Sequence, residues 1–234
     1  MKRKHALLLS GLLLLLCAFL CVPGDCASEG YGHVFAKNRD RIKKVALTFD
    51  DGPHPRYTPK ILEILDEYHI TATFFVIGTN VEYYPEALEA VAEAGCEIGN
   101  HTYSHTNLKN KSDSEIAEEL QKCEEAIQKV TGQKPALIRP PEGAYRENLQ
   151  KIARDMKYQI ILWSIDTMDW AHNPADRIVS EALDSLCDGD IILMHDYTSG
   201  KNTTCDALRI LIPAIQSRGF EFVTVSELIK GDAD

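Results

Sequence analysis

Acidic residues, histidines and one arginine directly follow short apolar segments at several places in this sequence. Asp50 and Asp51 come after Val45–Phe49, and His101 and His105 come after a second apolar segment. The other members of this set are Arg139 after Ile138, Asp166 and Asp169 after Trp163, and His195 after Met194. In parallel α/β folds, active-site groups gather at the carboxyl ends of the strands. We therefore expect these side chains to meet at one rim.

Asp51, His101 and His105 are the candidate metal ligands. The two histidines are four residues apart, a spacing that puts both imidazoles on one side of a helical turn. This spacing alone is weak evidence, because two surface histidines also produce it. A carboxylate from a separate strand end completes a set of three ligands, which leaves positions open for water and substrate. Zinc suits these ligands best, and cobalt, nickel, manganese and iron are the alternatives.

Asp50 and His195 are the candidate base and acid. Neighbouring side chains on an extended strand end point apart, so we expect Asp51 to face the metal and Asp50 to be free to accept a proton from water. A turn-forming aspartate before Gly52 is the alternative, but it explains only one of the two. A histidine with an ordinary pKa of about 6.5 can protonate a leaving group near neutral pH. The alternative for His195 is a buried histidine satisfied by the backbone.

Six further positions could support this chemistry. Arg139 could hold Asp50 in its ionised form through a charge-assisted pair, with a rim salt bridge as the alternative. Asp169 could orient His195 and favour its charged form. The apolar side chains Tyr145, Trp163, Trp170 and Leu193 could line a pocket or belong to the core, and the core is favoured for Trp163. We expect His54 and His172 in the groove or on the surface rather than as ligands.

Strand and helix patterns alternate from Lys44 onward, which indicates a parallel α/β architecture of one domain. Strands are expected at Val45–Phe49, Ala72–Ile77, Cys96–Gly99, Ala136–Ile138, Gln159–Trp163, Asp190–Met194 and Glu221–Val223. Helices are expected from Thr58 as N-cap, over 86–94, from Ser112 with a capping box to Glu115, over 146–156, and over 174–186, 205–217 and 226–229. Periodicity does not distinguish a barrel from an open doubly wound sheet.

The first 27 residues differ from the rest. Three basic residues precede the uncharged apolar run Ala6–Val22, which is the order of a secretory signal. The run also reaches the lower limit for spanning a bilayer, about 17 residues, so an uncleaved N-terminal anchor is the alternative. We expect an exported protein that is extracellular or associated with the wall or membrane of a bacterium, with residues 28–43 as an entry segment.

The charge and the cysteine content limit the partners and the crosslinks that we expect. Without residues 1–27 the chain carries 34 acidic and 22 basic residues, which makes nucleic acid a poor partner because phosphate needs basic patches. Cys96, Cys123, Cys187 and Cys205 lie inside the domain. Export would permit two disulfides among them in three pairings, and buried free thiols are the alternative. We expect a monomer.

Five segments carry a resemblance to a known family. They are TFDDGP at Thr48–Pro53, HTYSH at His101–His105, RPPEG at Arg139–Gly143, DTMDW at Asp166–Trp170 and LMH at Leu193–His195. In this order and spacing they resemble the polysaccharide deacetylases of carbohydrate esterase family four, a domain shared with rhizobial chitooligosaccharide deacetylases. The resemblance runs from about Lys44 to Ile229 and implies a distorted, incomplete (β/α) barrel of about seven units over residues 44–231.

The resemblance also implies roles for single residues. Asp50 would be the general base supported by Arg139, and His195 would be the general acid tuned by Asp169. The metal ligands would be Asp51, His101 and His105, and the substrate contacts would be Pro141, Glu142, Gly143, Tyr145, Trp170 and Leu193. Many members have an aromatic residue where this chain has Glu142, which would change the groove wall but spare the oxyanion donor, a backbone N–H.

The implied activity is removal of N-acetyl groups from a polysaccharide or oligosaccharide. The RPPEG segment resembles the bacterial cell-wall subgroup and favours peptidoglycan over chitooligosaccharides or acetylated xylan. Two hypotheses from other classes compete with this one. The first is a catalytically inactive glycan-binding protein, and the second is a metal-dependent amidase acting on a small amide.

Overall fold

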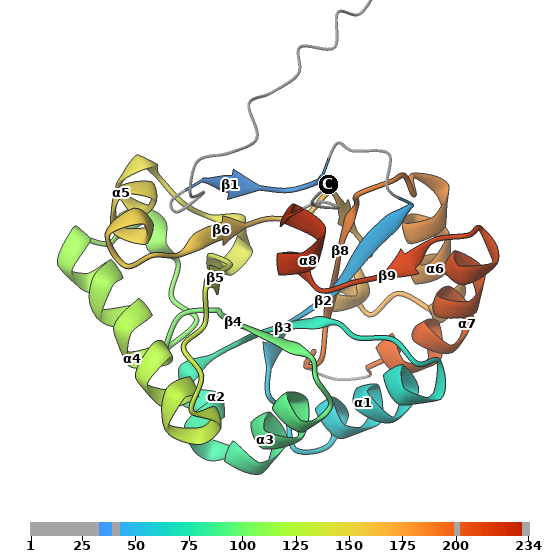
Figure 1. The fold of residues 1–234 in the computed structure, drawn as a ribbon, viewed down its shortest axis with the longest axis horizontal. Coiled ribbons are helices and arrows are strands. Elements are labelled where there is room, and N and C mark those ends of the chain that lie inside the picture. The colour runs from blue at the N-terminus through green and yellow to red at the C-terminus, as the bar shows by residue number, and fades with distance from the viewer. Residues whose placement is uncertain (1–32, 39–42, 199–201, 231–234) are drawn as a thin grey trace, which may run out of the picture.

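The computed structural model describes residues 33–38, 43–198 and 202–230, in which helices surround a curved sheet of parallel strands (Figure 1). The strands are β1 Val34–Phe35, β2 Lys44–Gly52, β3 Thr73–Val76, β4 Glu97–Asn100, β5 Leu137–Ile138, β6 Gln159–Ile161, β7 Ile165–Asp166, β8 Ile191–His195 and β9 Glu221–Phe222. The helices are α1 Tyr57–Glu67, α2 Gly78–Tyr83, α3 Pro85–Glu93, α4 Asp113–Thr131, α5 Glu147–Asp155, α6 Ala175–Asp184, α7 Thr204–Ser217 and α8 Val225–Lys230.

The strands follow the order β1-β6-β5-β4-β3-β2-β8-β7, and β9 pairs with the beginning of β2. Each pair of neighbouring strands in this order is parallel, and no pairing between described residues joins β7 back to β1. The sheet is therefore a distorted, incomplete (β/α) barrel, as the family resemblance implied. The seven strands expected from the sequence are all present. The two-residue strands β1 and β7 add to them, and β1 lies in the expected entry segment.

Alternation along β2 determines which side chains face the centre of the barrel. Val45, Leu47 and Phe49 join the large core cluster that the sheet forms with α1, α3, α6 and α7. Successive strand residues point to opposite faces, so Thr48 and Asp50 lie on the inner face, above the buried interior. A polar pair therefore sits at the inner carboxyl end of this central strand.

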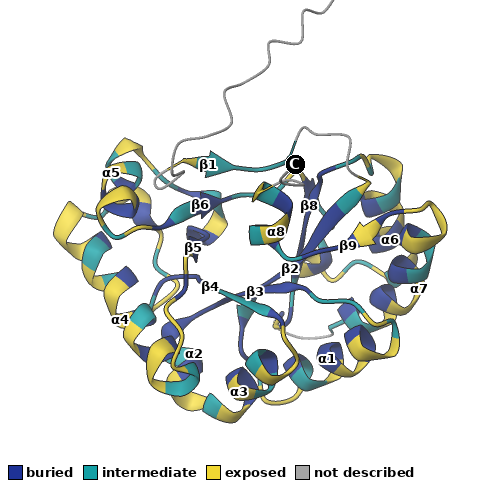
Figure 2. Cartoon of the chain, viewed as in Figure 1, coloured by how far each residue is buried: buried dark blue, intermediate teal, exposed yellow. Residues whose placement is uncertain are grey.

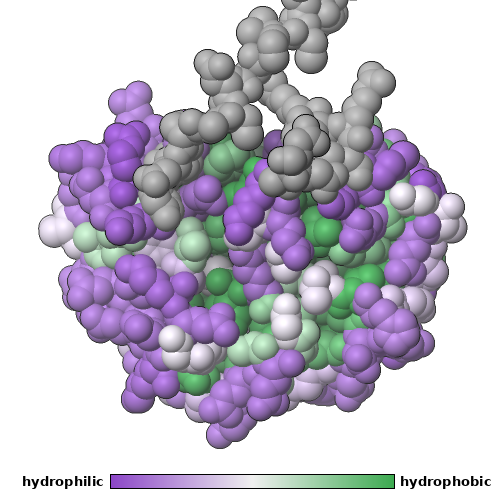
Figure 3. Space-filling model, viewed as in Figure 1, coloured by the Kyte–Doolittle hydropathy of each residue, from purple (hydrophilic) through white to green (hydrophobic). Residues whose placement is uncertain are grey.

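The interior of the barrel is filled by its own apolar cluster. Phe75 of β3 packs there with residues of β2, β5, β6 and β8, and α8 contributes Val225 and Leu228. Figure 2 shows the same division, with buried residues in the strands and on the inward faces of the helices. Figure 3 shows hydrophilic residues over the outer helices and hydrophobic residues toward the middle of this face. The interior of the barrel is therefore apolar, and the polar groups lie at the carboxyl ends of the strands.

Two expectations about helix starts have different outcomes. The capping box of Ser112 and Glu115 is present at the start of α4, and Gly132 in the left-handed conformation ends that helix. Thr58, in contrast, is not the N-cap of α1, because the helix begins at Tyr57. Its hydroxyl instead donates a hydrogen bond to Asp196 and accepts one from the His54 N–H.

The expected leader, residues 1–27, lies outside the described residues. Within the described residues, none of the helices has the length and apolar character needed to cross a membrane. The four cysteines of the domain are free thiols in this structure, with Cys96 and Cys123 buried and Cys187 exposed.

Candidate active site

Parallel strand register brings the candidate residues to one rim. Asp50 of β2 pairs with His195 of β8, so the candidate base and acid lie side by side at the same level. On the other side, Asn100 of β4 pairs with Ile138 of β5, and the next residues along these two chains are His101 and Arg139. Adjacent strand ends therefore present a carboxylate, two imidazoles and a guanidinium together.

A bulge at the end of β2 determines where Asp51 points. The pairing with β3 shifts register between Asp50 and Gly52, and Asp51 has a φ of 77°. A bulge inserts one residue and re-aims its side chain. As a result, both carboxylates approach the same imidazole, since His101 Nε2 lies 3.4 Å from Asp51 Oδ1 and 3.8 Å from Asp50 Oδ2. The expectation that the two neighbouring side chains point apart was wrong, because it assumed a regular strand.

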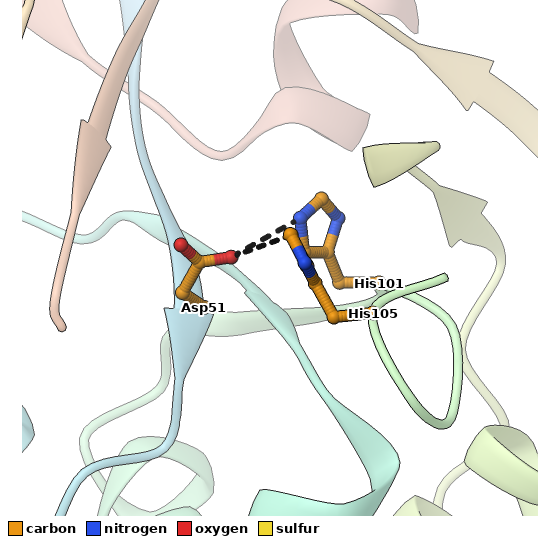
Figure 4. Close-up of side chains that lie close together, drawn as sticks. All are labelled: Asp51, His101 and His105. Atoms are coloured by element: carbon orange, nitrogen blue, oxygen red, sulfur yellow. Dashed lines mark ion pairs between the residues drawn. The ribbon is translucent and has the colours of Figure 1, made fainter. Parts of the chain in front are cut away.

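The three candidate metal ligands converge on one point (Figure 4). Asp51 Oδ1 lies 3.4 Å from His101 Nε2 and 3.1 Å from His105 Nε2. This oxygen is buried and has no hydrogen-bond donor among the described residues. Burial raises the pKa of Asp51, but the neighbouring histidines lower it by more. The pKa therefore lies well below its ordinary value. A buried, ionised oxygen without a donor, facing two imidazole nitrogens, fits a divalent cation.

The segment that carries the histidines is a loop rather than the helical turn expected from the four-residue spacing. Thr102 and His105 both have positive φ values, 67° and 55°. The loop is anchored on α4, where the Glu119 carboxylate accepts hydrogen bonds from the N–H groups of Tyr103 and Ser104. His101 Nδ1 contacts the carbonyl oxygen of Arg139 at 2.8 Å. Donation of Nδ1–H to this carbonyl leaves the Nε2 lone pair for a metal, as in many metal-bound histidines.

Asp50 is buried against a guanidinium. Arg139 Nη1 donates to Asp50 Oδ1 at 2.7 Å and to the hydroxyl of Thr48 at 2.8 Å. Other guanidinium nitrogens donate to the carbonyl oxygens of Ile161 and Leu162. The Arg139 side chain is 0% exposed, so this ion pair is removed from water. Removal of either partner would leave an uncompensated charge in the interior.

Asp169 contacts both the ring and the backbone of His195. One carboxylate oxygen lies 2.7 Å from His195 Nδ1, and the other accepts the His195 N–H and the hydroxyl of Thr204, each at 2.8 Å. Burial lowers the pKa of His195, but the hydrogen bond and charge of Asp169 and the charges of Asp50 and Asp51 together raise it by more, to about 9. The ring is therefore protonated at neutral pH, with Nε2–H available to the site.

Asp169→Asn should shift the alkaline limb of the activity profile. The variant loses the main group that raises the pKa of His195 while the burial that lowers it remains. In wild type, stability from His195 protonation is complete below the unfolded pKa of about 6.5 and is lost as the pH rises through about 9. We expect the alkaline limb of kcat/KM to move down by about two pH units and this stability loss to disappear.

Profiles of kcat/KM and urea midpoints between pH 6 and 10 test this expectation. Asp166→Asn is the matched control, since Asp166 binds the Met168 N–H and the indole of Trp170 and is not a partner of His195. An alkaline limb in the Asp169 variant that coincides with wild type would remove Asp169 from this role.

The turn after Arg139 has an unusual backbone. Glu142 and Gly143 have φ values of 58° and 63°, and a Cβ at Gly143 would come within 3.0 Å of Trp163. The N–H groups of Gly143 and Ala144 are used within the turn, and its two prolines have none. The amide of Glu142 is thus the candidate oxyanion donor, while its carboxylate accepts a hydrogen bond of 2.6 Å from Asn107, next to the histidine loop.

The apolar candidates lie in different surroundings. Leu193 is buried and pairs with Thr48, one layer below Asp50 and His195, where it forms an apolar floor. Trp170 is half exposed, and its indole N–H donates to Asp166. Tyr145 packs against the cluster of α4 and α5 and lines a separate cavity near β1. Pro141 is buried, and Trp163 packs against the interior cluster, the position favoured for it.

Sequence reasoning missed two residues that hold this rim together. Asp196 is fully buried between β8 and the end of β2, and a Cβ at Gly52 would come within 2.0 Å of its carboxylate. Thr204 fixes the second oxygen of Asp169. The position of Asp196 directly after His195 was the only available signal, since its partner Thr58 lies 138 residues away in the chain.

Comparisons with known proteins agree with this geometry. The sequence pattern of the family described as polysaccharide deacetylase matches residues 37–161. A peptidoglycan-N-acetylglucosamine deacetylase of Bacillus cereus is 38% identical over 203 residues, which cover 86% of this chain and 74% of that protein.

Two solved structures have the same fold. A peptidoglycan N-acetylglucosamine deacetylase in complex with 4-naphthalen-1-yl-N-oxidanyl-benzamide is 39% identical, with a TM-score of 0.80 over 84% of this chain and 92% of the other. A CE4 family pseudoenzyme from Bacillus anthracis is 33% identical, with a TM-score of 0.80 over 85% of this chain and 69% of the other. The pattern match, the relative and the shared fold lead to one conclusion: this chain belongs to the polysaccharide deacetylase family, whose active members are metal-dependent hydrolases of polysaccharide acetyl groups.

Proposed function

We propose that this protein removes N-acetyl groups from the amino sugars of peptidoglycan, with a divalent cation held by Asp51, His101 and His105. The observation that carries this proposal is the position of the three candidate ligands. They lie at the same rim as a buried base paired to Arg139 and a protonated acid paired to Asp169. A metal cluster alone would fit many proteins, but one flanked by a base and an acid fits hydrolysis.

Zinc is the proposed cation. The ligand set has two imidazole nitrogens and one carboxylate oxygen, which zinc binds readily while leaving positions open. A cation bound there would polarise the acetamide carbonyl and increase the acidity of a water molecule. The Arg139 carbonyl oxygen, which holds His101 Nδ1 at 2.8 Å, would keep that imidazole oriented toward the cation.

The protein's own groups would then perform the proton transfers. The Asp50 carboxylate accepts a proton from the attacking water, and the resulting O–H group forms the new bond to the acetyl carbon. The amide of Glu142 donates to the developing oxyanion. When the C–N bond breaks, His195 Nε2–H protonates the departing amine. Acetate and a free amino sugar are the products, and Asp50 carries the proton that restores His195.

Peptidoglycan is the proposed polymer, and export is proposed with it. The Bacillus cereus relative and the solved deacetylase are both named for peptidoglycan N-acetylglucosamine. The signal-like sequence of residues 1–27 would deliver the protein to the wall, either free or anchored. Chitooligosaccharides and acetylated xylan are alternative substrates for the same chemistry.

An inactive glycan-binding protein is the candidate from another class, because a relative of similar fold is a pseudoenzyme. Two features of this chain disfavour it. The ligands Asp51, His101 and His105 converge, and Asp50 and His195 are register partners on adjacent strands. A protein that only binds glycans has no need for a buried base beside a protonated acid.

Acetate release from purified protein, with and without a chelator, tests the proposed function. We expect release from peptidoglycan to exceed release from chitooligosaccharides and acetylated xylan, to vanish with chelator and to return with added zinc. Metal content measured on the same samples separates metal loss from unfolding. Release that survives complete metal removal would contradict the metal role, and release only from chitooligosaccharides or xylan would contradict the polymer.

A further inference from the structure

Five aromatic side chains gather beside the candidate active site, and we call them the aromatic shelf. They are His54, Tyr57, Tyr83, Tyr84 and Tyr197. His54 lies at the centre, stacked on Tyr197 with ring centroids 4.8 Å apart and an interplanar angle of 9°. Its centroid is 4.9 Å from that of Tyr57 and 6.2 Å from that of Tyr84.

The shelf is exposed to solvent. Tyr83 is 76% exposed, Tyr84 is 36% exposed and Tyr197 is 40% exposed. These are three of the five large apolar side chains exposed among the described residues, so exposure is concentrated here. His54 covers one face of the Tyr197 ring, and the residue is still exposed. Clustered exposed aromatic rings mark binding surfaces.

Two members of the shelf lie in the loops that also carry the candidate catalytic groups, whereas Tyr57 and Tyr83 belong to the helices α1 and α2. His54 follows Asp51 by three residues, and Tyr197 follows His195 by two. Buried contacts join the loops, because Thr58 donates to the Asp196 carboxylate and accepts the His54 N–H at 2.8 Å. The shelf therefore adjoins the catalytic rim, and the buried contacts of Thr58 fix its position.

The chemistry of the shelf fits an uncharged sugar ring. The negative face of an aromatic ring attracts the partly positive C–H groups of a pyranose face. His54 Nδ1 accepts the N–H groups of Arg56 and Tyr57, each at 3.2 Å, so the other ring nitrogen carries the hydrogen and can donate to a hydroxyl. Burial and Arg56 lower the pKa of His54, and the ring is neutral at neutral pH. The tyrosine hydroxyls add donors and acceptors around the rings.

We propose that the aromatic shelf binds a pyranose ring of the glycan chain next to the sugar that loses its acetyl group. This inference rests on the proposed function and extends it, since it assigns the site that makes the protein prefer a chain over a single sugar. Tyr197 and Tyr84 supply the stacking surface, and His54 orients Tyr197.

Kinetics on substrates of different length test the shelf. For the double variant Tyr84→Ala/Tyr197→Ala we expect KM for chitopentaose and for isolated glycan strands to rise about tenfold. We expect kcat and metal content to stay near wild type, and activity on N-acetylglucosamine to be unchanged. Tyr197→Phe should keep most of the affinity because it keeps the ring. Ile210→Ala, a substitution of an exposed apolar side chain on α7, is the matched control.

Calorimetric titration of chitopentaose gives a second readout that needs no turnover. Weaker binding by the double variant than by Ile210→Ala supports the shelf. Equal affinity and equal KM in the double variant and wild type would overturn it. Absence of acetate release by wild-type protein from every glycan would instead reject the proposed function, and the titration would still decide whether the shelf binds glycan.

Discussion

Asp50→Asn should reduce acetate release by about two to four orders of magnitude while the metal content of the protein stays near wild type. Asparagine has nearly the same shape as aspartate, but its amide cannot accept the proton from water. The metal should remain, because the convergent ligands are Asp51, His101 and His105, and Asp50 Oδ2 lies 3.8 Å from His101 Nε2.

His101→Ala is the contrasting variant. It removes a ligand that is buried and oriented by the Arg139 carbonyl, so we expect loss of both metal and activity. Single-turnover acetate release and metal analysis on the same preparations measure the two effects. Full activity in Asp50→Asn would show that another group is the base. Loss of metal from that variant would make Asp50 a ligand instead.

Arg139→Met should cause the largest loss of stability. Arg139 is fully buried, stacks over Phe75 with its guanidinium carbon 4.2 Å from the ring centroid, and pairs with Asp50 at 2.7 Å. Removal of one partner from a buried ion pair leaves an uncompensated charge, which typically costs about 3–5 kcal/mol of unfolding free energy. Two backbone carbonyl groups also lose their donor.

A double-mutant cycle separates the charge effect from the loss of packing. Asp50→Asn/Arg139→Met has no orphaned carboxylate, so urea unfolding should show it to be more stable than Arg139→Met alone. Thr48→Val, which removes a hydroxyl that accepts from Arg139 and donates to the Ile192 carbonyl, is the control for loss of hydrogen bonds without loss of the ion pair. Additive losses in the double variant would mean that the Asp50–Arg139 pair contributes no coupling energy.

The residues of the rim were predictable from the sequence because parallel strands deliver their carboxyl ends to one edge. Apolar segments predicted the long strands, and local capping signals predicted α4. The curvature of the sheet was not predictable in this way, because periodicity along one strand carries no information about how neighbouring strands curl. Strands of two residues, such as β1 and β7, are too short to show any period.

The backbone details of the site could not be predicted from the sequence. A non-glycine residue at positive φ is uncommon, yet Asp51, His105 and Glu142 all adopt it. The bulge brings both aspartates to one imidazole, a result that a regular strand forbids. The link between Thr58 and Asp196 spans 138 residues of sequence and exists only after β2 and β8 have paired.

Arg139 serves the site through two different parts of its structure. Its guanidinium holds Asp50, whereas its main-chain carbonyl holds His101, a proposed metal ligand. Every amino acid has that carbonyl, so exchange of the side chain leaves the His101 contact chemically intact. We therefore expect mutation at position 139 to reduce activity while the affinity for metal survives. A bound cation is therefore a poor marker of activity among relatives of this fold, and a surviving metal site is what a decayed enzyme would be expected to retain.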